Sequence, residues 1–307
     1  MNLRELEYLV AVAEELHFHK AAARCFVSQP TLSGQIKKLE EELGVLLIDR
    51  NNRRVFMTDA GKAIVAQART VLSNSKVLKE IAQSFQDHMI SEIQLGLIPT
   101  VAPYLLPQIM APLKQQFPNL KLWLHEYQTH VLLEKLRNAE LDLLILALPI
   151  NSNEFEKVIL FEEPFWLAVS KQDKLAKKKR IQLKDLNHKE ILLLEEGHCL
   201  RDHALDVCYM AGASEFNSFH ATSLETLRHM VGEGMGITLL PELAVLRYLK
   251  STAEDISYIP FVEPAPTRQI GMLYRKGSYR NQTYQQIAQV IMEKFNRKKP
   301  ATSKSEC

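Results

Sequence analysis

Two cysteines, Cys199 and Cys208, lie nine positions apart in a segment rich in ionisable side chains. Residues 201–211 contain neither glycine nor proline and are followed by Gly212, so they are predicted to form a helix that ends at this glycine. Cys199 would lie just before this helix, among three side chains that can carry positive charge: His198, Arg201 and His203. Because a helix N-terminus and nearby cations stabilise a thiolate, Cys199 is predicted to be a reactive thiol.

Cys208 would lie inside the helix beside Leu205, where it is expected to be buried and unreactive. Helical residues nine positions apart are separated by about 13 Å, whereas a disulfide requires Cα atoms within about 7 Å. A bond between the two cysteines would therefore form only if the helix unwound. Oxidation of Cys199 to a sulfenic acid, followed by attack of Cys208, would exchange one local structure for another. From these residues alone, two ordinary buried thiols remain the alternative.

The composition indicates a globular protein and limits the cellular compartments in which it is expected. Of the 307 residues, 46% are hydrophobic and 24% are charged, which excludes a disordered acidic chain and a fibrous rod. Four cysteines are too few for a disulfide scaffold and indicate a reducing compartment. No apolar run is long enough to cross a bilayer and the first residues lack an export signal, so a cytoplasmic protein without membrane contact is expected. Lys and Arg total 38 against 36 Asp and Glu, so nucleic-acid binding would require local clustering of charge.

Such a cluster lies near the N-terminus, where residues 16–39 include four Lys and Arg residues and no acidic residue. One helix is predicted to end near His17 and a second to cover 20–25. Ser28 is a good cap for a third helix, because Pro30 is tolerated only in a first helical turn. The third helix would bury one apolar face, formed by Leu32, Ile36 and Leu39. Two short helices with a polar and basic outer face predict a helix-turn-helix that binds DNA.

A basic hairpin is predicted next, because the apolar segments 46–48 and 55–57 flank a polar tip that carries three arginines. This hairpin would be the wing of a winged helix. The predicted DNA-binding residues of the helix-turn-helix are Arg24, Ser28, Gln29, Pro30, Thr31, Ser33, Gly34, Lys37 and Lys38, and those of the wing are Arg50, Arg53 and Arg54.

A long helix is predicted from the cap at Thr58 and Asp59 to about Gln86. Apolar and small residues recur along it every three or four positions, which is typical of a helix that pairs with a copy of itself. The predicted dimer contacts are Ile64, Ala68, Val71, Leu78, Ala82 and Phe85. Packing of this face on its own domain is the alternative.

From residue 91 onward, apolar strands alternate with helices, which predicts an α/β domain. The predicted strands are 93–98, 120–124, 143–148, 165–169, 191–194, 237–240 and 270–274. The predicted helices are 102–117, 129–138, 201–211, 223–233 and 279–296. The last strand and helix are expected to return to the first strands, leaving two lobes with a cleft between them.

Residues 18–42, which read FHKAAARCFVSQPTLSGQIKKLEEE, resemble the LysR-type bacterial transcriptional regulators. The second half resembles the peroxide-sensing members of that family. This resemblance lies in LIPTVAPYLLP at 97–107, GHCLRDHAL at 197–205, ATSLETLR at 221–228 and GMGITLLP at 234–241. Together the matching segments extend over most of residues 1–295.

The resemblance implies an α + α/β fold with a winged helix-turn-helix (1–58), a long dimerisation helix (59–89), a two-lobed, periplasmic-binding-protein-like regulatory domain (90–296) and a disordered tail (297–307). It implies an activator that responds to hydrogen peroxide through a reversible disulfide between Cys199 and Cys208. The implied peroxide-pocket residues are Thr100, Thr129, His198, Asp202 and Arg268. The implied partners are promoter DNA, a second copy in a homodimer or homotetramer, RNA polymerase, and a thiol reductant of the glutaredoxin or thioredoxin type.

Three other functions are open from the sequence. A LysR-type regulator that binds a small anion in the cleft would have the same architecture. A metal sensor could use His198, Cys199, His203 and Cys208, although their spacing matches no established zinc pattern. An enzyme, a thiol peroxidase, would leave the helix-turn-helix unexplained, so no enzymatic activity is expected. No cofactor is expected either, because Gly232, Gly234 and Gly236 precede a strand instead of following one.

Overall fold

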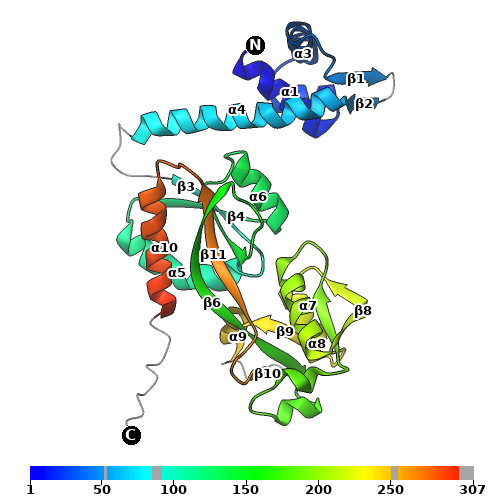
Figure 1. Cartoon of the computed structure of the whole chain (residues 1–307), viewed down its shortest axis with the longest axis vertical. Helices are drawn as coiled ribbons and strands as arrows, with labels where there is room; N and C mark the ends of the chain where they lie inside the picture. Colours follow the sequence, from blue (N-terminus) through cyan, green and yellow to red (C-terminus); the bar gives the residue numbers. More distant parts are fainter. Residues whose placement is uncertain (52–53, 85–91, 250–254, 297–307) are drawn as a thin grey trace. The chain divides into compact units, whose positions relative to one another are not determined.

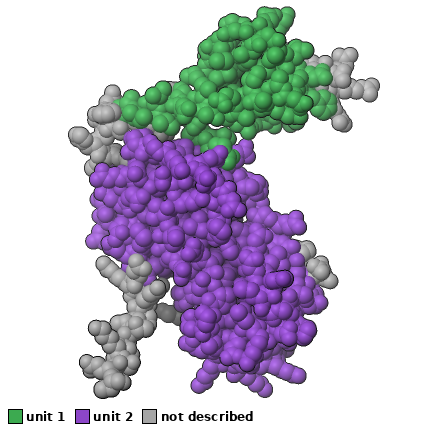
Figure 2. Space-filling view, viewed as in Figure 1, with its two compact units in different colours: residues 1–88, 137–139 green, residues 89–136, 140–307 purple. Residues whose placement is uncertain are grey.

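A computed structural model of the chain describes residues 1–51, 54–84, 92–249 and 255–296. The chain forms two compact units, residues 1–88 with 137–139 and residues 89–136 with 140–307, which Figure 2 shows in different colours. We describe each unit by itself. Within the described ranges, no helix is long and apolar enough to span a membrane.

The first unit is the predicted winged helix-turn-helix followed by a long helix. Its elements are α1 (Leu3–Glu15), α2 (Phe18–Arg24), α3 (Gln29–Leu43), β1 (Ile48–Asn51), β2 (Arg54–Met57) and α4 (Asp59–Ser84). Strands β1 and β2 pair antiparallel as the wing. The Ser28 side chain accepts a hydrogen bond from the Thr31 backbone N–H at 3.3 Å, and Gly44 ends α3 in the left-handed conformation. Leu32, Ile36 and Leu39 are fully buried, so the predicted inner face is confirmed.

The face of α4 predicted to pair with another chain divides into two parts. Ala68 is buried in the core of the helix-turn-helix, and Ile64 packs against the same core, so these two residues contact their own domain. In the same unit, α1 packs against α4. Val71, Leu78 and Ala82 are exposed, whereas Phe85 lies outside the described residues.

The second unit has two lobes, as predicted. The first lobe contains the parallel strands β3 (Glu92–Leu97), β4 (Lys121–Glu126) and β5 (Leu143–Leu148) with helices α5 (Ala102–Gln116), α6 (Thr129–Arg137) and α10 (Asn281–Asn296). The second lobe contains β7 (Glu190–Leu194), β8 (Ser214–Ala221), β9 (Thr238–Pro241), β10 (Ile256–Pro260), α7 (Cys199–Ala211), α8 (Leu224–Gly232) and α9 (Glu242–Tyr248). Its connecting segments include two 3₁₀ helices, Lys174–Lys177 and Leu183–Leu186.

Two strands run from one lobe to the other (Figure 1). Strand β6 (Phe155–Ser170) pairs with β11 (Thr267–Arg275) through its first part and with β9 and β10 through its second part. Strand β11 also pairs antiparallel with β5, so the final strand and helix return to the first lobe as predicted. These crossing strands hold the loops of the two lobes opposite each other, and the candidate site lies between those loops.

Candidate functional site

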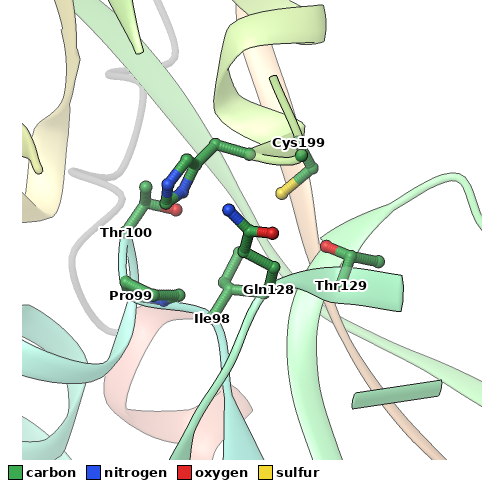
Figure 3. A pocket seen from close by; sticks show the side chains of 8 residues that line it. Ile98, Pro99, Thr100, Gln128, Thr129 and Cys199 are labelled. Carbon is green, nitrogen blue, oxygen red and sulfur yellow. The ribbon is translucent and has the colours of Figure 1, made fainter. Parts of the chain in front are cut away.

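Cys199 lines a small pocket between the two lobes. Its walls in the first lobe come from the loop after β3 and from the start of α6, and in the second lobe from the start of α7. The lining residues are Ile98, Pro99, Thr100, Gln128, Thr129, Gly197, His198 and Cys199. In Figure 3, the Cys199 sulfur points toward the Gln128 amide and the Thr129 hydroxyl. The pocket therefore places hydroxyl and amide groups from one lobe opposite a thiol from the other.

The start of α7 differs slightly from the sequence prediction. Cys199 is the first residue of the helix, and His198 is the residue that precedes it. The backbone N–H groups of the first turn of a helix carry partial positive charge and lack partners within the helix. The Cys199 thiol is partly exposed and belongs to this first turn.

The three side chains expected near Cys199 differ in charge and in their partners. Burial lowers the pKa of His198, an effect that the charge of Glu195 partly offsets, so this imidazole is neutral at pH 7. Arg201 points to β8, where its two terminal nitrogens donate to the Glu215 carboxylate at 2.6 and 3.0 Å. His203 Nε2 lies 3.0 Å from the Leu148 backbone oxygen at the end of β5.

Cys208 lies on the buried face of α7 and is 2% exposed. Burial, together with the nearby charge of Glu215, raises the pKa of Cys208 to about 11, so its thiol is protonated at neutral pH. Both cysteines are free thiols, and α7 is helical throughout the interval between them. Nine helical positions span about 13 Å, so the two sulfurs are too far apart for a disulfide while α7 is helical.

The structure brings together three of the five residues expected to support the pocket: Thr100, Thr129 and His198. Asp202 is instead an exposed residue in the first turn of α7. Arg268 lies behind the wall, where its Nη1 donates to the Thr100 hydroxyl oxygen at 3.1 Å. The Thr129 hydroxyl is buried and has no hydrogen-bond partner within the described residues, so it is available to a bound molecule.

Gln128 is a pocket residue that the sequence analysis missed. It lies next to Thr129, but nothing in its spacing predicts that it faces Cys199. Gly197 has a φ of +92°, and a Cβ there would lie 2.7 Å from the Gln128 side-chain oxygen. A side chain at position 197 would therefore displace this amide, which explains why glycine precedes His198. Among the described residues, no group of three or more His, Cys, Asp or Glu side chains is placed to hold a metal ion.

The outer face of the helix-turn-helix is polar and open to solvent. The exposed predicted DNA-binding residues are Arg24, Ser28, Gln29, Pro30, Thr31, Gly34, Lys37 and Lys38, and Ser33 is partly exposed. The Ser28 and Thr31 hydroxyls lie 2.7 Å apart as part of the helix cap. Gly34 has open space where a Cβ would be, so the backbone of α3 can approach a partner closely there. Arg53 and the side chains of Arg50 and Arg54 lie outside the described residues.

Two of the expected phosphate-binding cations already have carboxylate partners. Arg24 pairs with Glu14 at 2.5 Å. Lys38 pairs at 3.1 Å with Glu5, whose side chain is 1% exposed, and this hydrogen bond lowers the pKa of Glu5. Both side chains remain exposed, Arg24 at 51% and Lys38 at 62%, so phosphate binding by them stays a prediction that requires exchange of these partners. Lys37 makes only an exposed pair with Glu41, at 3.7 Å, which DNA phosphates can replace.

Comparison with known proteins agrees with the two units. Residues 3–62 match the bacterial regulatory helix-turn-helix proteins of the lysR family, and residues 86–296 match the LysR substrate binding domain. A helix-turn-helix joined to a two-lobed domain with a thiol pocket defines a DNA-binding regulator that carries its own sensor. This chain belongs to the LysR family of bacterial transcriptional regulators.

Three relatives are similar over nearly the whole chain. The DNA-binding transcriptional dual regulator OxyR of Escherichia coli K12 is 51% identical over 296 residues, which cover 96% of both chains. The full-length structure of an OxyR variant from Pseudomonas aeruginosa is 38% identical, with a TM-score of 0.74 over 95% of this chain and 94% of that one. A hydrogen-peroxide-bound OxyR mutant from Corynebacterium glutamicum is 30% identical, with a TM-score of 0.65 over 96% of this chain and 93% of that one.

Proposed function

We propose that this protein is a transcriptional regulator that responds to hydrogen peroxide by forming a reversible disulfide between Cys199 and Cys208. The observation that carries the proposal is the position of Cys199 at the first residue of α7, facing hydroxyl and amide groups across a pocket, with a second thiol in the same helix. The names of the relatives, hydrogen peroxide-inducible genes activator among them, support this function.

The proposed chemistry consumes one peroxide and two thiols. The Cys199 thiolate attacks one peroxide oxygen, the O–O bond breaks, and the departing hydroxide takes up a proton to leave as water. Cys199 is then a sulfenic acid, oxidised by two electrons. The Cys208 thiol attacks the Cys199 sulfur and gives up its proton, the S–O bond breaks, and the second oxygen leaves with that proton as water. The products are one disulfide and two water molecules.

The pocket supplies donors for the first step. The Thr100 and Thr129 hydroxyls can hold the peroxide oxygens and donate to the departing one, and a neutral His198 retains one N–H donor. We expect Thr100→Val to slow oxidation by peroxide without preventing oxidation by diamide, which needs no such donor. Asp202 and Arg268 have no direct contact in the proposed chemistry, because neither lines the pocket.

The second step requires a change of structure. Cys208 is buried and too far from Cys199 for a bond while α7 is helical, so part of the helix must unwind. The covalent bond would then retain the unwound state until a reductant breaks it. A change at α7 alters the surface of the second lobe. Subunits of an oligomer that contact this surface would then pack differently in the reduced and oxidised states.

We also propose how the remaining parts act. Residues 1–58 bind promoter DNA through α3 and the wing, 59–89 join two copies into a dimer that can pair into a tetramer, and 90–296 sense peroxide. Residues 297–307, which we expected to be a disordered tail, lie outside the described residues. RNA polymerase and a reductant of the glutaredoxin or thioredoxin type would be partners in the cytoplasm. Arg50→Ala is expected to weaken binding to specific and random duplexes alike.

One experiment tests this function against its main alternative. The reduced protein is treated with one equivalent of hydrogen peroxide and digested, and mass spectrometry maps any bond between residues 199 and 208. We expect this bond in the wild type and its absence in Cys199→Ser, which should also lose induction of a reporter gene. If Cys199→Ser still responds to peroxide, or if a small anion induces the reporter without oxidation, the proposal is wrong.

A further inference from the structure

A buried carboxylate, Glu163, lies behind the pocket where the two lobes join, and the chemistry above does not use it. Glu163 on β6 is directly opposite Arg268 on β11, and their side chains are 1% and 0% exposed. Glu163 Oε2 accepts from Arg268 Nε at 2.8 Å and lies 2.8 Å from Nη2. Its other oxygen accepts from the Leu243 backbone N–H at 2.9 Å, in the first turn of α9. Both carboxylate oxygens are therefore occupied.

Arg268 in turn holds the pocket residue Thr100. Its Nη1 donates to the Thr100 hydroxyl oxygen and its Nη2 donates to the Thr100 backbone oxygen, both at 3.1 Å. Thr100 is 2% exposed and belongs to the loop between β3 and α5. The pair of Glu163 and Arg268 therefore links one wall of the pocket to the two strands that cross between the lobes.

These contacts determine which way the Thr100 hydroxyl acts. A guanidinium only donates hydrogen bonds, so the Thr100 oxygen is an acceptor toward Arg268. The hydroxyl hydrogen must then point elsewhere, and Thr100 lines the pocket. We propose that Glu163 is a positioning residue that, through Arg268, makes Thr100 a hydrogen-bond donor to the peroxide that reacts with Cys199. This inference rests on the proposed function.

Glu163 is required because a guanidinium with no exposed surface needs a compensating anion. Without the carboxylate, Arg268 would carry an uncompensated buried charge, and its most favourable response would be to turn away from Thr100 toward water. The Thr100 hydroxyl could then accept or donate in any direction. The carboxylate therefore maintains the donor geometry that the pocket offers to an oxygen leaving group.

The test compares two reactions of the same thiol in the full-length protein. Rates of Cys199 with hydrogen peroxide and with iodoacetamide are measured at the same pH for the wild type and Glu163→Gln. Alkylation reports the accessibility and ionisation of the thiol, whereas only the peroxide reaction requires a donor for a departing oxygen. We expect the ratio of the peroxide rate to the alkylation rate to fall about 10- to 100-fold in Glu163→Gln. Partial recovery is expected in Glu163→Asp, which retains the charge.

A double-mutant cycle shows whether the effect passes through Thr100. If it does, Glu163→Gln changes the ratio little once Thr100→Val is present, because the donor has already been lost. A second variant, Glu163→Leu with Arg268→Met, removes both buried charges and is expected to fold even if Glu163→Gln does not. It should show the same reduced ratio.

An unchanged ratio in a folded Glu163→Gln protein, or in the double replacement, would overturn the inference. The inference would also be overturned if the effects of Glu163→Gln and Thr100→Val on the ratio multiplied in the double variant. Failure of the proposed function is a distinct result, because then the wild-type Cys199 itself would not react with peroxide.

Discussion

The ion pair between Arg201 and Glu215 should stabilise the reduced protein and thereby set how easily the disulfide forms. Arg201 is in α7, Glu215 is in β8, and their side chains are 14% and 15% exposed. If disulfide formation unwinds α7, this pair breaks on oxidation. Removing it therefore destabilises the reduced state alone. We expect Arg201→Gln to favour the disulfide and to make its reduction potential more negative.

The size of the shift follows from the two hydrogen bonds. A hydrogen bond to a charged group contributes about 1.5–3 kcal/mol, and glutamine retains one donor to the Glu215 carboxylate, so one such bond is lost and the net loss is about 1.5–3 kcal/mol. For a two-electron couple about 30 mV corresponds to 1.4 kcal/mol, which gives a shift of roughly 30–65 mV. Removal of the partner, in Glu215→Gln, should shift the potential in the same direction.

The assay equilibrates each protein in a series of dithiothreitol redox buffers, traps free thiols by alkylation and measures the oxidised fraction by mass spectrometry. Lys135→Gln is the matched control, because it removes an ion pair at 2.7 Å, with Glu140, that lies outside α7. The control should leave the potential unchanged. If Arg201→Gln lowers the melting temperature but not the potential, the pair persists in the oxidised protein and the unwinding argument fails.

Three further predictions concern single side chains. Because burial raises the pKa of Cys208 to about 11, the folded state retains a proton that the unfolded chain loses above about pH 9. The free energy of unfolding should therefore fall by about 2–3 kcal/mol from pH 9 to 11, and denaturant titrations of Cys208→Ala should lack this decline. In fluorescence anisotropy, Lys37→Gln should weaken binding to any duplex and reduce the slope of log K against log salt by about 0.9. Arg24→Gln should change the affinity and the slope little. Equal effects of the two variants would refute this distinction. Lys38→Gln should destabilise the first unit by about 1 kcal/mol at pH 7. Because the pKa of Glu5 is lowered in the folded protein, this contribution should shrink as the pH falls below about 4.5, and the melting curves of the two proteins should move closer together.

Local signals explain why much of the fold could be predicted. The Ser28 cap, Pro30 in the first turn and the spacing of Leu32, Ile36 and Leu39 involve residues within one helix, so α3 follows from the sequence. The same applies to α7, which Gly212 ends as predicted. Strand β6 was predicted only over 165–169, because its first part pairs with β11, more than a hundred residues away.

The parts of the site that were missed or misjudged depend on distant residues. Nothing near Lys38 in the sequence indicates that the buried Glu5 of α1 is its partner. Gln128 faces Cys199 only because the two lobes meet there. Arg268 reaches Thr100 from β11, so it acts behind the pocket wall instead of in it.

Amide hydrogen exchange of α7 in the reduced protein and after one equivalent of hydrogen peroxide tests the central claim most directly. Our account predicts that amides between residues 199 and 211 lose protection in proportion to the amount of disulfide formed between Cys199 and Cys208. Full formation of this disulfide with unchanged protection of the helix would contradict it.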